Sequence, residues 1–99
     1  MTRNAIRVHR DPAAIARLEA LIAALPNGAR VELTLEDGSE LRCLIAARPM
    51  LQVFFDPAGE EGSNAVVRVE PLTDDPFALT AARDLWLDSI VSIRDVGPP

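Results

Sequence analysis

The residues best suited to chemistry are one cysteine, one histidine and a small group of carboxylates. A cysteine becomes a nucleophile when a nearby base or positive charge lowers the pKa of its thiol. Cys43 instead alternates with Leu41 and Ile45, which predicts an inward-facing thiol that packs as a small apolar side chain. The single histidine, His9, lacks the three or four ligands that a metal site requires. We therefore expect no catalytic residue and no metal site.

Carboxylates gather in the stretch DPAGEEGSN (56–64), where Asp56, Glu60 and Glu61 are of the type that binds calcium. They lack the regular alternation of oxygen ligands of an EF-hand loop, so we interpret the stretch as a solvated hairpin loop. No glycine-rich loop stands between a strand and a helix, and no pair of titratable groups is placed for acid–base catalysis. The sequence predicts a non-enzymatic protein without a cofactor.

Charge is distributed unevenly along the chain. All ten basic residues are arginines: five precede Val31 beside two carboxylates, a net charge of +3, and five follow beside thirteen carboxylates, a net charge of −8. The net charge of −5 and the pI near 4.7 disfavour a nucleic-acid partner, because nucleic-acid binders carry a basic face. RNA binding would depend on the basic amino-terminal segment, whose candidate phosphate contacts are Arg3, Arg7, Arg10 and Arg17.

One helix is expected over residues 11–26, after an arm of residues 1–10. Asp11 is suited to cap the helix, and Pro12 then falls at the first helical position, where a missing N–H costs nothing. Apolar residues recur at helical spacing, and Gly28 is suited to the left-handed turn that ends the helix.

Beyond the helix the apolar period changes from 3.6 to 2, which predicts strands. Asp37-Gly38 is a strong hairpin signal, and Pro49 must break or bend the chain. The segments that follow the alternating pattern are 30–36, 40–47, 50–55, 65–70, 85–87 and 90–96. Residues 71–83 suit either a plain loop or a short helical turn capped at Asp75.

These elements fit one domain, residues 1–99: a helix, then a five-stranded, strongly bent antiparallel barrel over residues 30–96, and a tail at 97–99. Short strands with exposed edges aggregate, which favours closure into a small barrel. No apolar run approaches the length of a membrane span, and no secretory signal is recognisable. A lone cysteine also suits a reducing compartment, so we expect a cytoplasmic protein without a membrane partner.

Two stretches carry a resemblance to a known fold. VELTLEDGSELRCLI (31–45) resembles the first Sm motif, and LWLDSIVSIRDV (85–96) resembles the end of an Sm barrel, where one strand passes through a single 3₁₀ turn into the last. Over nearly its full length the chain is similar to a small uncharacterised family of proteobacterial proteins with a variant Sm-like fold. The resemblance implies an Sm-like or SH3-like small barrel and no established activity.

The chain departs from Sm proteins at three places. Cys43 stands where the bent second strand usually carries glycine. At the loop that contacts RNA in Sm proteins the chain has RPMLQ (48–52), in which Gln52 is a partial replacement for the usual Asp and Asn. Asp88-Ser89 takes the place of an Arg-Gly pair, and an aspartate there would repel phosphate. A standard uridine pocket is therefore not expected.

Two functions follow as expectations. The first is a binding or assembly module that acts through protein contacts and forms homo-oligomers by pairing edge strands or apolar patches. If Val53 and Phe55 face inward, Phe54 faces outward and needs cover. The candidate interface residues are Phe54, Leu44 and Trp86. The alternative is a divergent Sm-like RNA-binding protein that uses the basic arm and helix together with Gln52.

Overall fold

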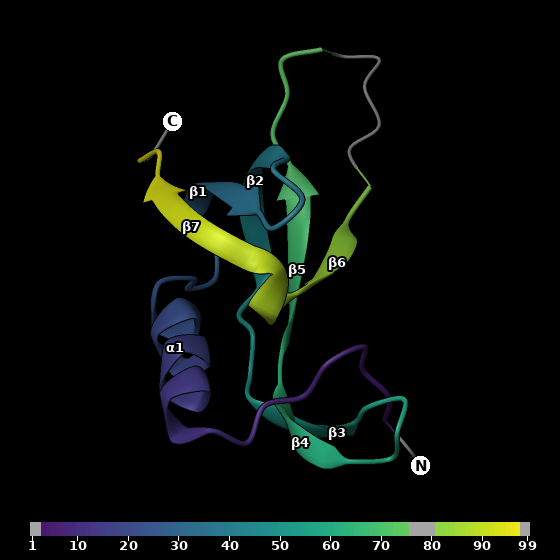
Figure 1. Ribbon diagram of the computed structural model, residues 1–99. Helices are drawn as coiled ribbons and strands as arrows, with labels where there is room; N and C mark the ends of the chain where they lie inside the picture. The colour runs from purple at the N-terminus through teal and green to yellow at the C-terminus, as the bar shows by residue number, and fades with distance from the viewer. Residues whose placement is uncertain (1–2, 76–80, 98–99) are drawn as a thin grey trace.

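The computed structural model describes residues 3–75 and 81–97, which contain one α-helix, seven strands and one 3₁₀ turn (Figure 1). Helix α1 spans Pro12–Ala23. The strands are β1 (Arg30–Leu35), β2 (Glu40–Ala47), β3 (Gln52–Phe55), β4 (Glu61–Asn64), β5 (Val66–Pro71), β6 (Arg83–Trp86) and β7 (Ile90–Asp95). The 3₁₀ turn η1 (Leu87–Ser89) links β6 to β7, as the resemblance to Sm barrels predicts.

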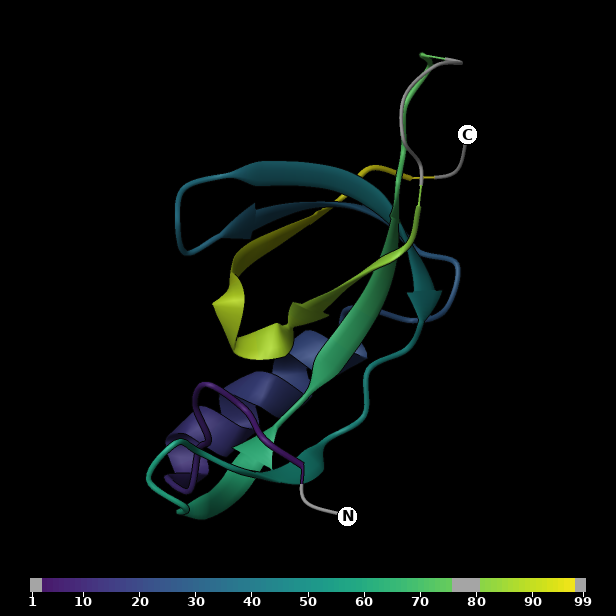
Figure 2. The same ribbon diagram turned by 90° about the vertical axis from the view of Figure 1, so that its right-hand side faces the viewer.

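The seven strands correspond to five longer, bent strands. One long strand consists of β2 and β3, another consists of β4 and β5, and β1, β6 and β7 are the other three. A five-stranded antiparallel sheet has the order β6-β5-β2-β1-β7, and β3 pairs with β4 in a second sheet. The chain bends at Pro49 between β2 and β3, and it passes from β4 to β5 through Ala65 alone. Figure 2 shows both long strands running the length of the molecule to the β3–β4 end. The predicted helix followed by a strongly bent, five-stranded small barrel is confirmed.

Helix α1 begins where the sequence predicts. The Asp11 carboxylate accepts a hydrogen bond of 3.2 Å from the Ala14 N–H, and Pro12 occupies the first turn. The helix ends at Ala23, three residues earlier than expected, and a turn that includes Gly28 at φ +80° leads into β1.

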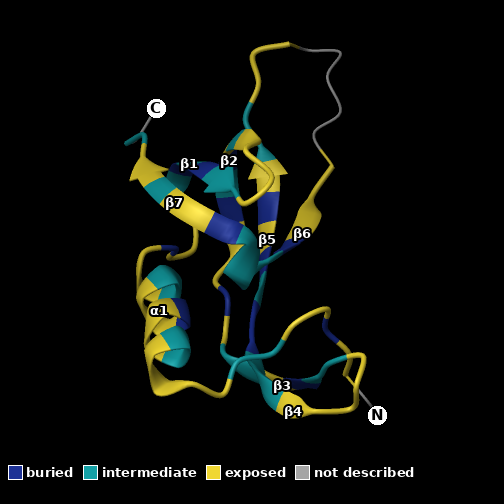
Figure 3. Ribbon diagram, viewed as in Figure 1, coloured by how far each residue is buried: buried dark blue, intermediate teal, exposed yellow. Residues whose placement is uncertain are grey.

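The core lies between the inner face of the strands and α1 (Figure 3). Its buried residues are Leu18, Leu25, Val31, Leu33, Cys43, Ile45, Ala65, Val67, Val69, Leu85, Leu87 and Ile90. The inward position predicted for Cys43 is confirmed, and burial raises the pKa of its thiol to about 11. A thiol with such a pKa is inert at neutral pH.

The hairpin predicted at Asp37-Gly38 is confirmed. Gly38 adopts φ +88°, and its N–H donates to the Leu35 carbonyl at 2.9 Å. The Ser39 hydroxyl and N–H donate to the Asp37 carboxylate at 2.6 and 2.9 Å, which lowers the pKa of Asp37. The helical turn considered after Asp75 falls on residues 76–80, which lie outside the described residues.

The orientation predicted for the third strand is wrong. Phe54 is 6% exposed and Val53 is 52% exposed, so Phe54 faces inward. Odd-numbered residues such as Ile45 face the core in β2, but a register shift after Ile45 and the bend at Pro49 change the alternation before β3. The Phe54 ring meets the Trp86 ring edge-to-face, with centroids 5.2 Å apart, and this contact covers it within the chain.

The loop predicted over residues 56–64 is shorter than expected. Only residues 56–60 connect the strands, because Glu61–Asn64 form β4. This segment has a turn-like composition and no alternating apolar pattern, so its strand conformation depends on partners distant in sequence. Those partners are β3 and the amino-terminal arm.

Candidate functional site

The amino-terminal arm crosses the β3–β4 sheet and closes both of its edges. At β3, the Ala5 N–H donates to the Phe55 carbonyl at 2.9 Å, and at β4, His9 and Ser63 exchange two hydrogen bonds of 2.8 Å. Neither edge of this small sheet is left free for a partner strand.

Two residues of β4 allow the arm to lie so close. At Gly62, a Cβ atom would stand 2.8 Å from a methyl carbon of Val8, so the crossing requires glycine. Asn64 is 1% exposed; its side chain donates to the Arg7 carbonyl at 2.9 Å and accepts from the Ala65 N–H at 2.8 Å. These contacts fix the arm by its backbone.

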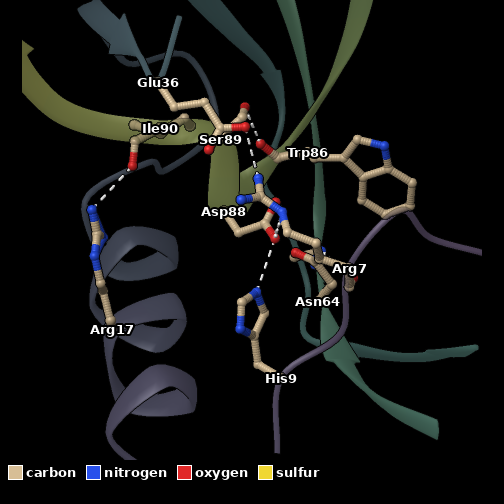
Figure 4. Close-up of polar contacts among 10 residues, drawn as sticks. Arg7, His9, Arg17, Glu36, Asn64, Trp86, Asp88, Ser89 and Ile90 are labelled. Carbon is tan, nitrogen blue, oxygen red and sulfur yellow. Dashed lines mark hydrogen bonds and ion pairs between the residues drawn. The ribbon is translucent and has the colours of Figure 1, made fainter. Parts of the chain in front are cut away.

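Asp88, in η1, holds the arm by its side chains (Figure 4). One Asp88 carboxylate oxygen lies 2.9 Å from His9 Nε2 and 3.2 Å from Arg7 Nε. The Arg7 guanidinium also reaches Glu36 at 2.8 Å. We call these four residues, Arg7, His9, Glu36 and Asp88, the arm clamp. It ties the arm to both η1 and the β1–β2 hairpin.

The four arginines predicted to contact phosphate all have partners within the chain. Arg7 belongs to the arm clamp. The other three pairs are Arg3 with the Gln52 side chain, Arg10 with Glu60 at 2.9 Å, and Arg17 with the Ile90 carbonyl at 3.1 Å. The partners of these arginines are spread over β3, the 56–60 connection, η1 and β7. The four arginines therefore do not form one uncompensated cationic face.

Gln52, the expected partial replacement for the RNA-contacting residues of the Sm loop, lies at the start of strand β3. Residues 48–51 form the bend between β2 and β3, and the chain reverses later, at residues 56–60. Gln52 begins β3 opposite Asn64 and receives a hydrogen bond from Arg3. The side chains of Arg3 and Gln52 therefore join the amino-terminal arm to β3.

The arm clamp has the groups of an acid–base pair, but Ser89 and Cys43 are both engaged elsewhere in the described part of the chain. His9 and Asp88 are arranged as a base and its orienting acid, but Asp88 is also engaged by Arg7. The neighbouring Ser89 hydroxyl donates to the Trp86 carbonyl at 2.6 Å, and Cys43 is in the core. Among the described residues, no three His, Cys, Asp or Glu side chains are grouped to hold a metal.

A cavity of about 150 Å³ lies between α1 and the start of β7. Apolar side chains predominate in its wall, and residues of the arm clamp adjoin them. The lining residues are His9, Ala14, Arg17, Leu18, Leu21, Glu36, Asp88, Ile90 and Val91.

The five-stranded sheet ends in two strands that each have one neighbour. Among the described strands, β6 pairs only with β5, and β7 pairs only with β1. On β7, Val91 is 55% exposed. Of the predicted interface residues, Trp86 is half-buried on β6, Leu44 is half-buried on β2, and Phe54 is buried. The sheet edges, and not Phe54, offer surface to a partner.

Sequence reasoning did not assign structural roles to Asp88, Asn64 and Gly62. Asp88 and His9 are 79 residues apart in the sequence, so no local pattern links them. Asn64 and Gly62 stand in a polar, glycine-containing run that is typical of loops. The sequence does show a basic amino-terminal arm and an acidic remainder, which suggests that the two attract each other. It does not show which arginine pairs with which carboxylate.

The fold defines the class of protein, a variant of the Sm-like barrel. The chain is similar to the protein XC5848 from Xanthomonas campestris, whose crystal structure is described as a novel variant of the Sm-like motif. The identity is 31%, the TM-score is 0.88, and the match covers 98% of this chain and 100% of that one. The chain belongs to the family described as a domain of unknown function (DUF3247), which matches residues 2–96. No curated protein matches it.

These findings confirm the predicted resemblance and fold. In the part of the chain that the structure describes, no helix is long and apolar enough to cross a membrane.

Proposed function

We propose that this protein is a non-enzymatic assembly module in which β7 of one copy pairs with β6 of a second copy. The observation that carries the proposal is the complementary order of charges on these two sheet edges. β6 reads RDLW, and β7 reads IVSIRD. An arginine followed by an aspartate thus stands at the start of β6 and at the end of β7, beside apolar residues.

One antiparallel register satisfies both the faces and the charges. Leu85 pairs with buried Val67, and Ile93 pairs with buried Leu33, so both face inward. If Ile93 lies opposite Leu85 of a second copy, inward-facing residues stay on one side of the joined sheet.

The same register sets Arg94 opposite Asp84 and Asp95 opposite Arg83, so both charged pairs have opposite signs. Within the chain Arg94 also pairs with Glu32, and Asp84 also pairs with Arg68, so among the described residues only Arg83 and Asp95 bring charges that no other ion pair engages. A shift by one residue would set inward-facing residues opposite outward-facing ones. A shift by two residues would remove both charge pairs. The pattern thus favours a single alignment.

The contact joins two unlike surfaces, β7 of one copy and β6 of the other. Each pair of copies therefore keeps one β6 edge and one β7 edge free. Such a head-to-tail interface closes into a ring when its rotation allows and otherwise extends as a filament. The arm closes the edges of the β3–β4 sheet, which directs pairing to β6 and β7.

RNA binding has less support as a function. Its predicted phosphate contacts are engaged by carboxylates, an amide and a backbone carbonyl within the chain. An RNA strand would have to displace those partners in a chain of net charge −5.

Sedimentation velocity over a wide concentration range tests the assembly, with labelled uridine-rich RNA at low salt as a parallel measurement. We expect oligomers that dissociate on dilution, and no RNA binding. Ser92→Lys should weaken association because it adds a charge to the β7 edge. The matched control, Ala13→Lys, adds the same charge on exposed α1. A monomer at every concentration contradicts the proposal.

A further inference from the structure

A second pocket, of about 180 Å³, lies at the other end of the five-stranded sheet from the β3–β4 ribbon. Arg30 of β1 and Arg42 of β2 line it together with Leu72 and Asp74 beyond β5 and Val96 beyond β7. Arg30 and Arg42 point away from the core, because their neighbours Val31 and Cys43 are buried on the inner face. The pocket is separate from the arm clamp and from the cavity beside α1.

The two arginines are diagonal neighbours across the β1–β2 pair. Arg30 lies opposite Leu44, and Arg42 lies opposite Glu32, so both guanidinium groups extend from adjacent rows of the outer face. Like charges at such positions repel each other. Glu32 does not compensate them, since it pairs with Arg94 at 2.8 Å.

Within the described residues, neither Arg30 nor Arg42 forms an ion pair. Four other arginines do, namely Arg7, Arg10, Arg68 and Arg94. The chain has fifteen carboxylates for ten arginines, so carboxylates are not scarce. Two adjacent uncompensated guanidinium groups at one pocket therefore point to an anion from solution.

The pocket is held together by the same two residues. The Arg42 carbonyl accepts the Leu72 N–H at 2.9 Å, and the Arg30 carbonyl accepts the Val96 N–H at 3.0 Å. The segments that form the side walls are thus anchored to the strands that carry the arginines. A site whose walls are fixed in advance loses less entropy when a ligand binds.

We propose that Arg30 and Arg42 bind a small oxyanion, a phosphate or a carboxylate, between their guanidinium groups. The planar fork of donors on each guanidinium matches the oxygens of either group. Asp74, on the wall of the same pocket, forms no ion pair with either arginine and lowers the affinity by repulsion. The site is independent of the β6–β7 contact.

Titration of the isotope-labelled chain followed by NMR tests the site. Sodium phosphate and sodium acetate are the two probes, added at constant ionic strength against sodium chloride. We expect saturable shifts of the Arg30 and Arg42 side-chain N–H signals. Saturation by phosphate alone assigns a phosphate ligand, and saturation by both probes assigns a general oxyanion site.

Three variants make the test specific. Arg42→Gln should weaken binding about tenfold, because a charge-assisted contact is lost. Asp74→Asn should tighten it, whereas a site for cations would lose affinity. Arg48→Gln is the matched control, since Arg48 is exposed and lies outside the pocket. Shifts that grow linearly without saturation, or an affinity that is unchanged in Arg42→Gln, overturn the proposal.

Discussion

At the scale of single residues, Asp88 shows how one buried charge can fix a whole segment. Its side chain is 8% exposed and stands between two cationic or potentially cationic groups from the arm. A carboxylate in that position would be costly without Arg7, and Arg7 would lack a close partner on η1 without the carboxylate. Removing either partner should therefore cost more stability than breaking an exposed ion pair does.

Asp88→Asn tests this role. The variant keeps the size of the side chain and removes the charge that Arg7 requires, so we expect a loss of about 1–3 kcal/mol in the free energy of unfolding. Glu36→Gln is the matched control, because Glu36 is half-exposed and its pairing with Arg7 contributes about 0–1 kcal/mol. Urea denaturation measures both. Equal losses would show that Asp88 is no more important than a surface partner.

Cys43 gives a prediction about pH. Burial raises the pKa of its thiol from 9.0 to about 11, so the folded state favours the protonated thiol. The stability from this group is complete below pH 9.0 and declines as the pH rises from 9.0 toward about 11, by up to about 3 kcal/mol. Cys43→Ala should lack that part of the alkaline decline. If urea denaturation gives the wild type and Cys43→Ala the same loss of stability between pH 9.0 and about 11, ionisation of Cys43 does not cause that loss.

At the scale of elements, one aromatic contact joins the two sheets. Phe54 of β3 and Trp86 of β6 meet edge-to-face with an interplanar angle of 80°. The cycle of Phe54→Leu, Trp86→Leu and the double variant should yield a coupling energy of about 1 kcal/mol, measured by urea denaturation. Strictly additive losses would mean that each ring packs independently.

The elements that the sequence predicts well have local causes. The start of α1 follows from Asp11 and Pro12, and the β1–β2 hairpin follows from Asp37-Gly38. The orientation of β3 does not, because it depends on a register shift and a bend that change the alternation by one residue. β4 depends on the arm that crosses it at Gly62, which no local pattern reveals.

The candidate sites follow the same division. The sequence predicts a buried thiol at Cys43, and the structure confirms it. It also predicts a basic arm but not its carboxylate partners, since Glu36, Glu60 and Asp88 reach the arm only through the tertiary fold. Which arginines stay uncompensated, Arg30 and Arg42 among them, likewise depends on how the strands pair.

At the scale of the whole molecule, the arm and the sheet edges have opposite consequences for assembly. The arm closes the smaller sheet, whereas β6 and β7 of the larger sheet have no second neighbour in the part of the chain that the structure describes. Exposed edges of this kind lead to uncontrolled aggregation unless their pairing is specified. Opposite charges in one register supply such a specification, and they also predict that added salt weakens the assembly.

An exchange of charge between the paired ends of β6 and β7 tests the proposed contact. Arg83 and Asp95 are exposed, and neither forms an ion pair among the described residues. The Asp95 carboxylate accepts one hydrogen bond, from the Gly97 N–H at 2.7 Å, so exchanging the two residues removes one local contact at the end of β7. Sedimentation velocity would compare the wild type with Arg83→Asp, Asp95→Arg and the double variant. We predict that each single variant dissociates and that the double variant assembles again. Single variants that assemble like the wild type, or a double variant that stays monomeric while folded, would rule out the β6–β7 contact.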